Sequence, residues 1–286
     1  MSKTKLLTMV LAVFCALSWL PSIVLADVTI GIFPRRPAAQ SAKAYQPLAD
    51  YLSKELGEKV TLSIPKDFKE FWAAFQAKKY DLVHLNQYHY IRGHKEFGYK
   101  VIAANEEFGS AQIAGAIAVR KDSGINSIAD LKGKTILFGG SEKAVVSYIA
   151  NKAILKKAGL EEGRDYKTQF AKNPPSAVIG VYSKAADASG TGNIFMKIKA
   201  INSKIDVEQM KVIAETEPFI HLSWAVSGAM PDDKAMKIQK LMTELENSDA
   251  GKAVLKAALV EKFVAASDKD YDKVREITKY AIGEDY

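Results

Sequence analysis

Polar and aromatic side chains gather in four short segments, and the first three of them directly follow predicted strands. These segments are residues 33–37 (FPRRP), 86–90 (NQYHY), 139–143 (GGSEK) and 187–192 (DASGTG). Ligands of open α/β sheets bind outside the carboxyl ends of the strands, so we expect the four segments to line one cleft. The chemistry they offer is hydrogen bonding and charge recognition of a small polar solute.

The first and second segments supply most of the candidate ligand residues. Arg35 could bind an anion through charge-assisted hydrogen bonds, although loop arginines are more often simply solvated. Tyrosine side chains could wall the pocket while their hydroxyl groups donate hydrogen bonds. The second segment, expected to be a loop, contributes Asn86, Gln87, Tyr88, His89 and Tyr90.

The third segment contains a Gly139-Gly140-Ser141 turn before a long predicted helix that ends at Gly159. A helix start carries unpaired N–H groups and partial positive charge, so Ser141 could help to bind an oxyanion. Glu142 opposes this reading because it already satisfies the helix dipole, and Ser141 could equally be a simple N-cap. Lys143 could neutralise Glu142 and thereby favour anion binding.

The histidines do not predict a metal site. His84, His89 and His94 are five residues apart, a spacing that does not place them on one helical face. His221 stands in an apolar stretch and is expected to be a buried histidine that could still face the cleft. No G-x-S-x-G elbow, P-loop or H-E-x-x-H motif is present, so we predict neither an enzyme nor a cofactor.

The elements that must position these residues alternate between short β-branched runs and amphipathic helical stretches. Strands are expected at residues 28–33, 59–64, 80–85, 135–138 and 166–170, and helices near residues 45–57, 68–75 and from 232 onward. This order predicts α/β units, each with a mostly parallel sheet flanked by helices.

Two chain crossings, at residues 113–119 and 221–227, predict two hinged lobes. Residues 27–112 and 222–286 would form lobe 1, and residues 113–221 would form lobe 2.

Residues 1–26 have a basic start and a long apolar run, which predicts a secretory signal peptide cleaved after Ala26. The single cysteine, Cys15, lies within this segment, so thiol chemistry is not expected in the mature chain. The net charge of +7 is spread among interleaved lysines and acidic residues, as on a solvated surface. We therefore expect an exported chain with no nucleic-acid partner and no stable membrane insertion after cleavage.

Several stretches together resemble the periplasmic solute-binding proteins of phosphate, phosphite and phosphonate ABC importers, the PhnD-like family. They are residues 44–60 (AYQPLADYLSKELGEKV), 80–91 (YDLVHLNQYHYI), 98–140 and 185–189 (AADAS). The resemblance implies a two-lobed type II periplasmic binding protein that closes over a small ligand and presents it to a membrane permease. It also implies ligand contacts at Tyr45, at residues 86–90 and at Asp187.

The sequence departs from that family at two places. The family's S-T-S-G turn is replaced by GGSEKAVVS at residues 139–147, and its usual histidine is replaced within NPPSAV at residues 173–178. The expected ligand is therefore a phosphonate-, phosphite- or phosphate-like oxyanion, or a related zwitterion. The same fold could instead serve as a periplasmic sensing subunit for a membrane histidine kinase. An enzyme on this scaffold is a third reading, which the missing nucleophile opposes.

Overall fold

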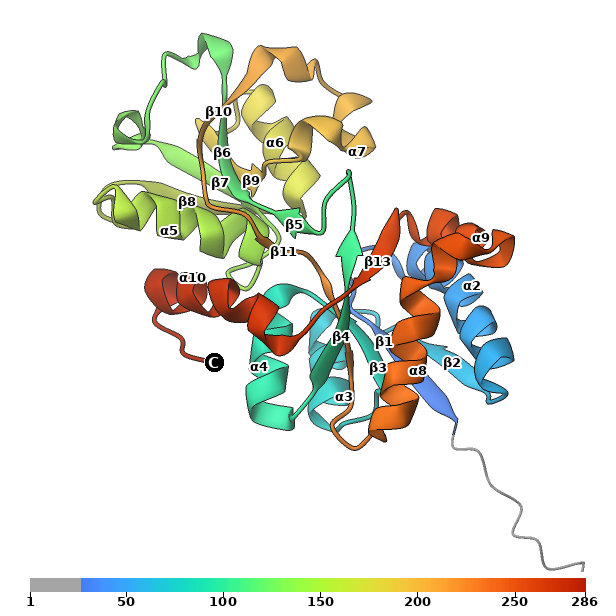
Figure 1. Cartoon of the computed structure of the whole chain (residues 1–286). Coiled ribbons are helices and arrows are strands. Elements are labelled where there is room, and N and C mark those ends of the chain that lie inside the picture. Colours follow the sequence, from blue (N-terminus) through green and yellow to red (C-terminus); the bar gives the residue numbers. More distant parts are fainter. Residues whose placement is uncertain (1–26) are drawn as a thin grey trace, which may run out of the picture.

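Two β-sheets organise residues 27–286, which are the residues that the computed structural model describes (Figure 1). The predicted signal peptide, residues 1–26, lies outside the described residues. The six-stranded sheet of lobe 1 contains β1 (Val28–Ile32), β2 (Val60–Ser63), β3 (Leu82–Leu85), β4 (Lys100–Glu106), β12 (Ser223–Val226) and β13 (Lys262–Ala265). The five-stranded sheet of lobe 2 contains β6 (Gly115–Arg120), β7 (Thr135–Gly139), β8 (Lys167–Ala171), β9 (Ala188–Gly192) and β10 (Met210–Glu215).

Most strands in each sheet point in one direction. The orders are β13-β4-β12-β3-β1-β2 and β10-β6-β9-β7-β8. In lobe 1, β1 pairs in parallel with β2 and β3, whereas β12 runs antiparallel to β3 and β4. In lobe 2, β7 pairs in parallel with β8 and β9, and β6 runs antiparallel to β9 and β10. The predicted α/β class with mostly parallel sheets is confirmed.

Helices cover both sheets, as the sequence periodicity predicted. The helices of lobe 1 are α2 (Ala38–Leu56), α3 (Phe68–Gln76), α4 (Gln87–Phe97), α8 (Asp232–Thr243) and α9 (Asp249–Ala258). Lobe 2 has α5 (Ala150–Lys157), α6 (Pro174–Tyr182) and α7 (Lys199–Asn202), and α10 (Asp272–Ile282) lies against both lobes. Local signals set the ends: Gly57 ends α2 with a φ of 72°, and the Asp67 side chain caps α3.

Two local predictions were wrong. Residues 87–90 are not a loop, because α4 begins at Gln87 and the Asn86 side chain caps it by accepting a hydrogen bond from the His89 N–H. The helix after the glycine pair begins at Val145, as a π-helical turn (Val145–Ile149) that continues into α5. Ser141 is therefore not an N-cap, and its hydroxyl accepts a weak hydrogen bond of 3.4 Å from the Lys143 N–H.

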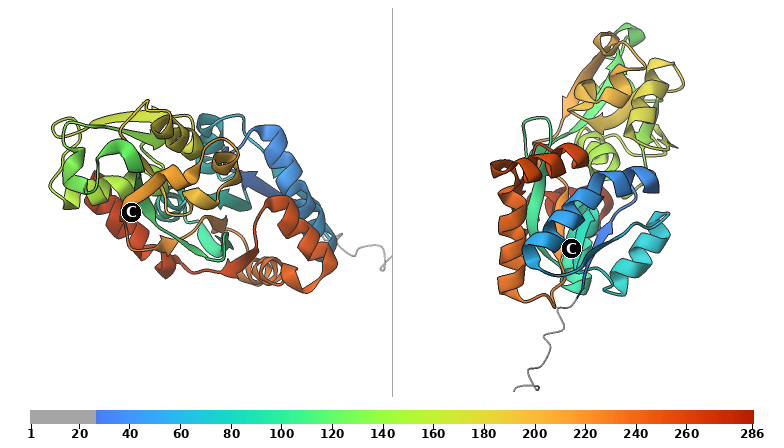
Figure 2. Two further views of the ribbon diagram at one scale, coloured as in Figure 1. Left: turned by 90° about the horizontal axis from the view of Figure 1, so that it is seen from above. Right: turned by 90° about the vertical axis from the view of Figure 1, so that its right-hand side faces the viewer.

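The two lobes are joined by paired crossing strands. β5 (Gln112–Ile113) leads out of lobe 1 and β11 (Phe219–Ile220) leads back, and the two pair antiparallel. The crossings are therefore residues 107–114 and 216–222, a few residues earlier than the sequence indicated, because most of residues 113–119 and 221–227 belong to β6 and β12. The right-hand view of Figure 2 shows the lobes one above the other.

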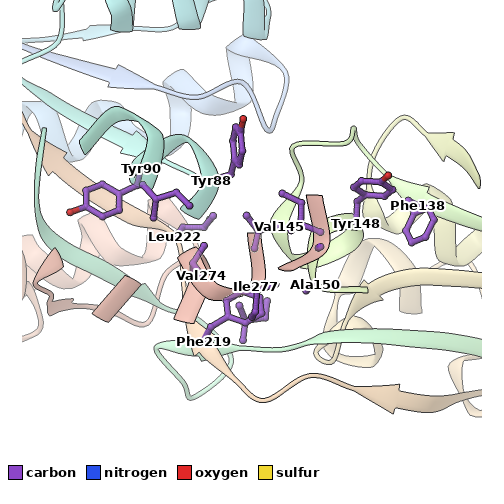
Figure 3. Close-up of a cluster of buried hydrophobic side chains, with 14 of the residues drawn as sticks. Tyr88, Tyr90, Phe138, Val145, Tyr148, Ala150, Phe219, Leu222, Val274 and Ile277 are labelled. Carbon is purple, nitrogen blue, oxygen red and sulfur yellow. The ribbon is translucent and has the colours of Figure 1, made fainter. Parts of the chain in front are cut away.

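One apolar cluster continues from lobe 1 into lobe 2 through α10. It joins Tyr88 and Tyr90 of α4 to Phe138 and Tyr148 of lobe 2. Val274 and Ile277 of α10, together with Phe219 of β11, fill the space between them (Figure 3). Because these side chains are buried, the lobes share a core on the α10 side of the hinge.

Candidate ligand-binding site

Five polar side chains from five separate segments lie at the end of the lobe 1 sheet that faces the hinge. Arg35 follows β1, Tyr45 lies in α2, His84 lies near the end of β3, Glu107 follows β4, and His221 precedes β12. Leu85, Ala104 and Ser223 are register partners, so the ends of β3 and β4 lie level with the start of β12. We call these five residues the edge pocket.

A partly buried ion pair belongs to the edge pocket. An Arg35 guanidinium nitrogen donates to Glu107 Oε1 at 3.2 Å, and the Asn105 amide donates to the same oxygen at 2.8 Å. Asn105 is itself fixed by the Trp224 indole N–H, which donates to its Oδ1 at 3.0 Å. Burial alone would raise the pKa of Glu107, but the Arg35 guanidinium and its other neighbours lower it to about 2.

The hydrogen-bond partner of His84 fixes its tautomer. Its Nδ1 lies 3.0 Å from the Ser223 carbonyl oxygen, and because a carbonyl can only accept, Nδ1 carries the hydrogen. The ring stacks on Trp224 with 4.5 Å between centroids and is fully buried. Burial, followed by the nearby Arg35 charge, lowers the pKa of His84 well below its usual 6.5. His84 is thus neutral, with a lone pair on Nε2.

His221 has the opposite tautomer. The backbone N–H of Leu222 donates to His221 Nδ1 at 2.7 Å, so the hydrogen of the neutral ring is on Nε2. Burial lowers the pKa of His221 to about 4, although the Glu107 carboxylate partly offsets this effect. The two histidines therefore present different atoms: an acceptor from His84 and a donor from His221.

Four buried polar atoms of the edge pocket have no hydrogen-bond partner among the described residues. They are Arg35 Nε, the Tyr45 hydroxyl, His84 Nε2 and His221 Nε2. A buried polar group without a partner costs about 1–3 kcal/mol, and such groups are few in native proteins. Four such atoms in one group of five side chains single out this group among the described residues.

A second polar cluster connects the lobes through the chain's last residues. We call Asn86, Tyr88, Lys143, Glu284 and Tyr286 the interlobe cluster. Lys143 Nζ lies 2.5 Å from Glu284 Oε1, and the Tyr88 and Tyr286 hydroxyls donate to Glu284 Oε2 at 2.5 and 2.9 Å. The Asn86 amide donates to the Lys143 carbonyl at 3.2 Å. Burial and then the Glu284 hydrogen bond raise the pKa of Tyr88 to about 12.

The remaining predicted residues lie in different surroundings. The Gln87 amide donates to the Ile220 carbonyl at the hinge, at 3.1 Å, and the Tyr90 hydroxyl donates to Asp268 at 2.7 Å. His89 is stacked on Phe68, with 5.6 Å between ring centroids. Ser141 lies with Lys143 in a shallow hollow of lobe 2 that Phe170 also lines.

Asp187 is not brought together with the others. It precedes β9, and its carboxylate accepts a hydrogen bond of 2.8 Å from the Thr135 N–H at the start of β7. Because β7 and β9 are parallel, Asp187 lies at the amino-terminal ends of these strands, whereas Ser141 lies beyond the carboxyl end of β7. Asp187 thus ties two strand starts together, as Asp81 does for β1 and β3 by accepting from the Thr29 N–H.

Sequence reasoning missed four members of these clusters. Glu107 follows β4, a strand that was not predicted, and His84 was weighed only as a metal ligand. Glu284 and Tyr286 follow the end of α10, whose sequence gave no sign of the cleft. For His84, the signal available was its place near the carboxyl end of a predicted strand.

The arrangement of two sheets around paired crossings is that of a type II periplasmic binding protein. The chain belongs to the family of periplasmic substrate-binding proteins of phosphonate ABC transporters, whose model matches residues 30–271. The structure is similar to PhnD1 of Prochlorococcus marinus in complex with methylphosphonate, with a TM-score of 0.73, 18% identity, and coverage of 88% of this chain and 97% of that one. A binding protein of an ABC phosphonate transporter from Pseudomonas aeruginosa is similar at a TM-score of 0.73 and 16% identity, covering 89% and 86% of the two chains.

A curated relative of another kind is the tetrathionate sensor histidine kinase TtrS of Salmonella typhimurium. It is 29% identical over 161 residues, which are 52% of this chain and 26% of that protein. The chain therefore matches only about a quarter of the length of this relative. Within residues 27–286, no helix combines the length and the apolar character that a membrane crossing requires.

The depressed pKa of Glu107 leads to a pH-dependent stability prediction. A folded-state pKa of about 2, against an ordinary 4.5, stabilises the protein above about pH 4.5, and this stabilisation is lost as the pH falls toward 2. Glu107→Gln should therefore lower the free energy of unfolding at pH 7 by on the order of 3 kcal/mol. Denaturant unfolding at several pH values should show this difference shrinking below pH 4.5.

Glu217→Gln is the control. Glu217 forms an exposed ion pair with Lys273, so this variant should change the free energy of unfolding by less than about 1 kcal/mol. An equal effect of the two variants would contradict the prediction.

The interlobe cluster leads to a second prediction. Glu284→Gln removes the charge that Lys143 pairs with, so backbone amides of residues 140–144 and 283–286 should exchange faster with deuterium. Exchange in β1 and β3 should not change. Asp285→Asn is the matched control, because this neighbouring carboxylate bonds only the exposed Lys279 side chain. Faster exchange at residues 140–144 in the control as well would show that Glu284 has no special role.

Proposed function

We propose that this chain captures a small oxyanion or a related zwitterion in the periplasm and presents it to an ABC permease. The observation that carries the proposal is the edge pocket, whose side chains include four buried polar atoms without a partner, one of them Nε of the partly buried Arg35. Family membership supports the periplasmic location and the permease partner. We further propose that residues 1–26 are removed after Ala26 during export.

Arg35 and Tyr45 on lobe 1, together with His221 in the returning crossing, are the proposed ligand contacts. The guanidinium would supply the charge-assisted hydrogen bond to the anion, and the Tyr45 hydroxyl lies beside it, where it helps to raise the pKa of Arg35 against the effect of burial. Because Glu107 balances the charge of Arg35, an amino group on a zwitterionic ligand would also find a partner in the pocket. Both ligand classes therefore suit the site.

Hinge closure would bring lobe 2 onto a ligand held at this edge. In this proposal residues 27–112 and 222–286 move against residues 113–221 about the paired strands β5 and β11. Ser141 and Lys143, after β7, are the lobe 2 residues that would approach the ligand, and Asn86, whose amide donates to the Lys143 carbonyl, would face them from lobe 1 beside Tyr88 and His89. The family is one of substrate-binding proteins, and we propose that the ligand is released unchanged.

Binding measurements test this proposal directly. Residues 27–286 would be titrated calorimetrically with phosphate, phosphite, methylphosphonate, sulfate and an aminoalkylphosphonate. A ligand at 100 times its Kd adds about 2.7 kcal/mol of stability, which is a shift of several degrees in Tm for a chain of this size. Arg35→Gln should weaken binding at least tenfold, or by about 1.4 kcal/mol. Arg164→Gln, at an exposed site, should bind normally. Equal affinity of both variants would remove Arg35 from the site.

The match to TtrS favours a second candidate function, in which the chain reports ligand occupancy to a membrane histidine kinase. Deleting the gene distinguishes the two roles. A transport role predicts that the deletion strain no longer takes up the labelled form of whichever ligand binds in the titrations. Transcription induced by that ligand should be unaffected when the ligand is supplied inside the cell at a saturating level. A sensing role predicts normal uptake and loss of the transcriptional response.

A further inference from the structure

The edge pocket presents a fixed pattern of hydrogen-bond donors and acceptors. Arg35 Nε and His221 Nε2 can only donate, whereas His84 Nε2 can only accept. The Tyr45 hydroxyl can do either, but it makes no hydrogen bond to His84 Nε2 in the structure. A ligand that hydrogen-bonds all three of these atoms must therefore accept from two groups and donate to one.

The acceptor character of His84 is enforced by its surroundings. Moving the hydrogen from Nδ1 to Nε2 would place the Nδ1 lone pair against the Ser223 carbonyl oxygen, and turning the ring over would place Cδ2 there, so either change would leave that carbonyl without this donor. Adding a second proton is opposed by burial and by the Arg35 charge, and the stack on Trp224 leaves the ring no polar partner on that face. His84 Nε2 therefore keeps its lone pair at neutral pH.

An oxyanion without a hydrogen does not fit this pattern. Each of its oxygens carries only lone pairs, so the oxygen that faced His84 Nε2 would oppose another lone pair, and the buried acceptor would stay unpaired. An oxyanion of the same charge and shape that keeps one acidic hydrogen can donate it to His84 while its other oxygens accept from Arg35 and His221. A site built to hydrogen-bond one such group rejects the analogue that lacks it.

We propose that the edge pocket recognises the protonated form of a small oxyanion, with His84 as the residue that accepts the ligand's hydrogen. This inference rests on the proposed function, and it adds the specificity of the same site. It assigns a specificity-determining role to a histidine near the carboxyl end of β3, an inner strand of the lobe 1 sheet.

Two pairs of anions test the inference by calorimetric titration of residues 27–286. In each pair, one anion carries an acidic hydrogen and the other does not. Hydrogenphosphate and sulfate share a charge and a tetrahedral shape, and so do hydrogen methylphosphonate and methanesulfonate. We expect the hydrogen-bearing member of at least one pair to bind at least tenfold tighter. His84→Phe keeps the aromatic stack and removes the acceptor, so it should abolish the preference. Tyr45→Phe should weaken both members alike and keep the preference.

Each result decides between the two claims. Equal binding of both members of each pair to the unaltered protein would overturn the inference while leaving oxyanion capture intact. A preference that survives in His84→Phe would overturn the assignment to His84. A preference lost in Tyr45→Phe would overturn it as well, because Tyr45 would then supply the discrimination. Absence of binding to all four ions would overturn the proposed oxyanion function itself. Should His84→Phe fail to fold, the ratio in the unaltered protein still decides the inference.

Discussion

The partly buried pairing of Arg35 with Glu107 is the constraint around which the hinge-facing end of the lobe 1 sheet is built. Removing two charges from water costs several kcal/mol per ion, and the cost is offset only where hydrogen bonds complete the geometry. Here Asn105 binds the carboxylate and Trp224 binds Asn105, so the fully buried indole of the core fixes the ion pair. A guanidinium held in this way keeps its Nε in one place at the cleft, which a solvated loop arginine would not do.

Contacts between the lobes oppose free motion of the hinge. The shared apolar core through α10 and the charges around Glu284 both tie lobe 2 to lobe 1 in the described state. A ligand can shift the open and closed populations only by its difference in affinity for them. Because the unpartnered atoms of the edge pocket belong to lobe 1 and to the returning crossing, that difference must come from what lobe 2 adds, and Lys143, whose carbonyl accepts from Asn86, is a lobe 2 residue that already contacts this end of lobe 1.

Much of the fold could be predicted because local signals agree with it. Strand β1 matches the predicted run to within one residue, and Gly57 and Asp67 act at helix ends as their residue types suggest. The candidate site was harder to predict, because the order of the strands in the sheet decides which strand ends lie side by side. Arg35, Tyr45 and His221 were predicted, whereas Asp187 was expected at the cleft but precedes its strand and so lies at the other edge. No local pattern predicts that Arg35 and Glu107, which are 72 positions apart in the sequence, form an ion pair.

The backbone where the chain returns to lobe 1 sets the chemistry of the pocket. The Leu222 N–H fixes the tautomer of His221, the Ser223 carbonyl fixes that of His84, and the Leu222 carbonyl accepts from the Asn105 N–H. Three consecutive residues, 221–223, thus join the end of the returning crossing to the start of β12. A movement of the hinge that displaced this segment would alter the donor and acceptor pattern offered to the ligand. In the proposed function, recognition and closure would therefore be coupled through the same short stretch of main chain, without a separate relay between the pocket and the hinge.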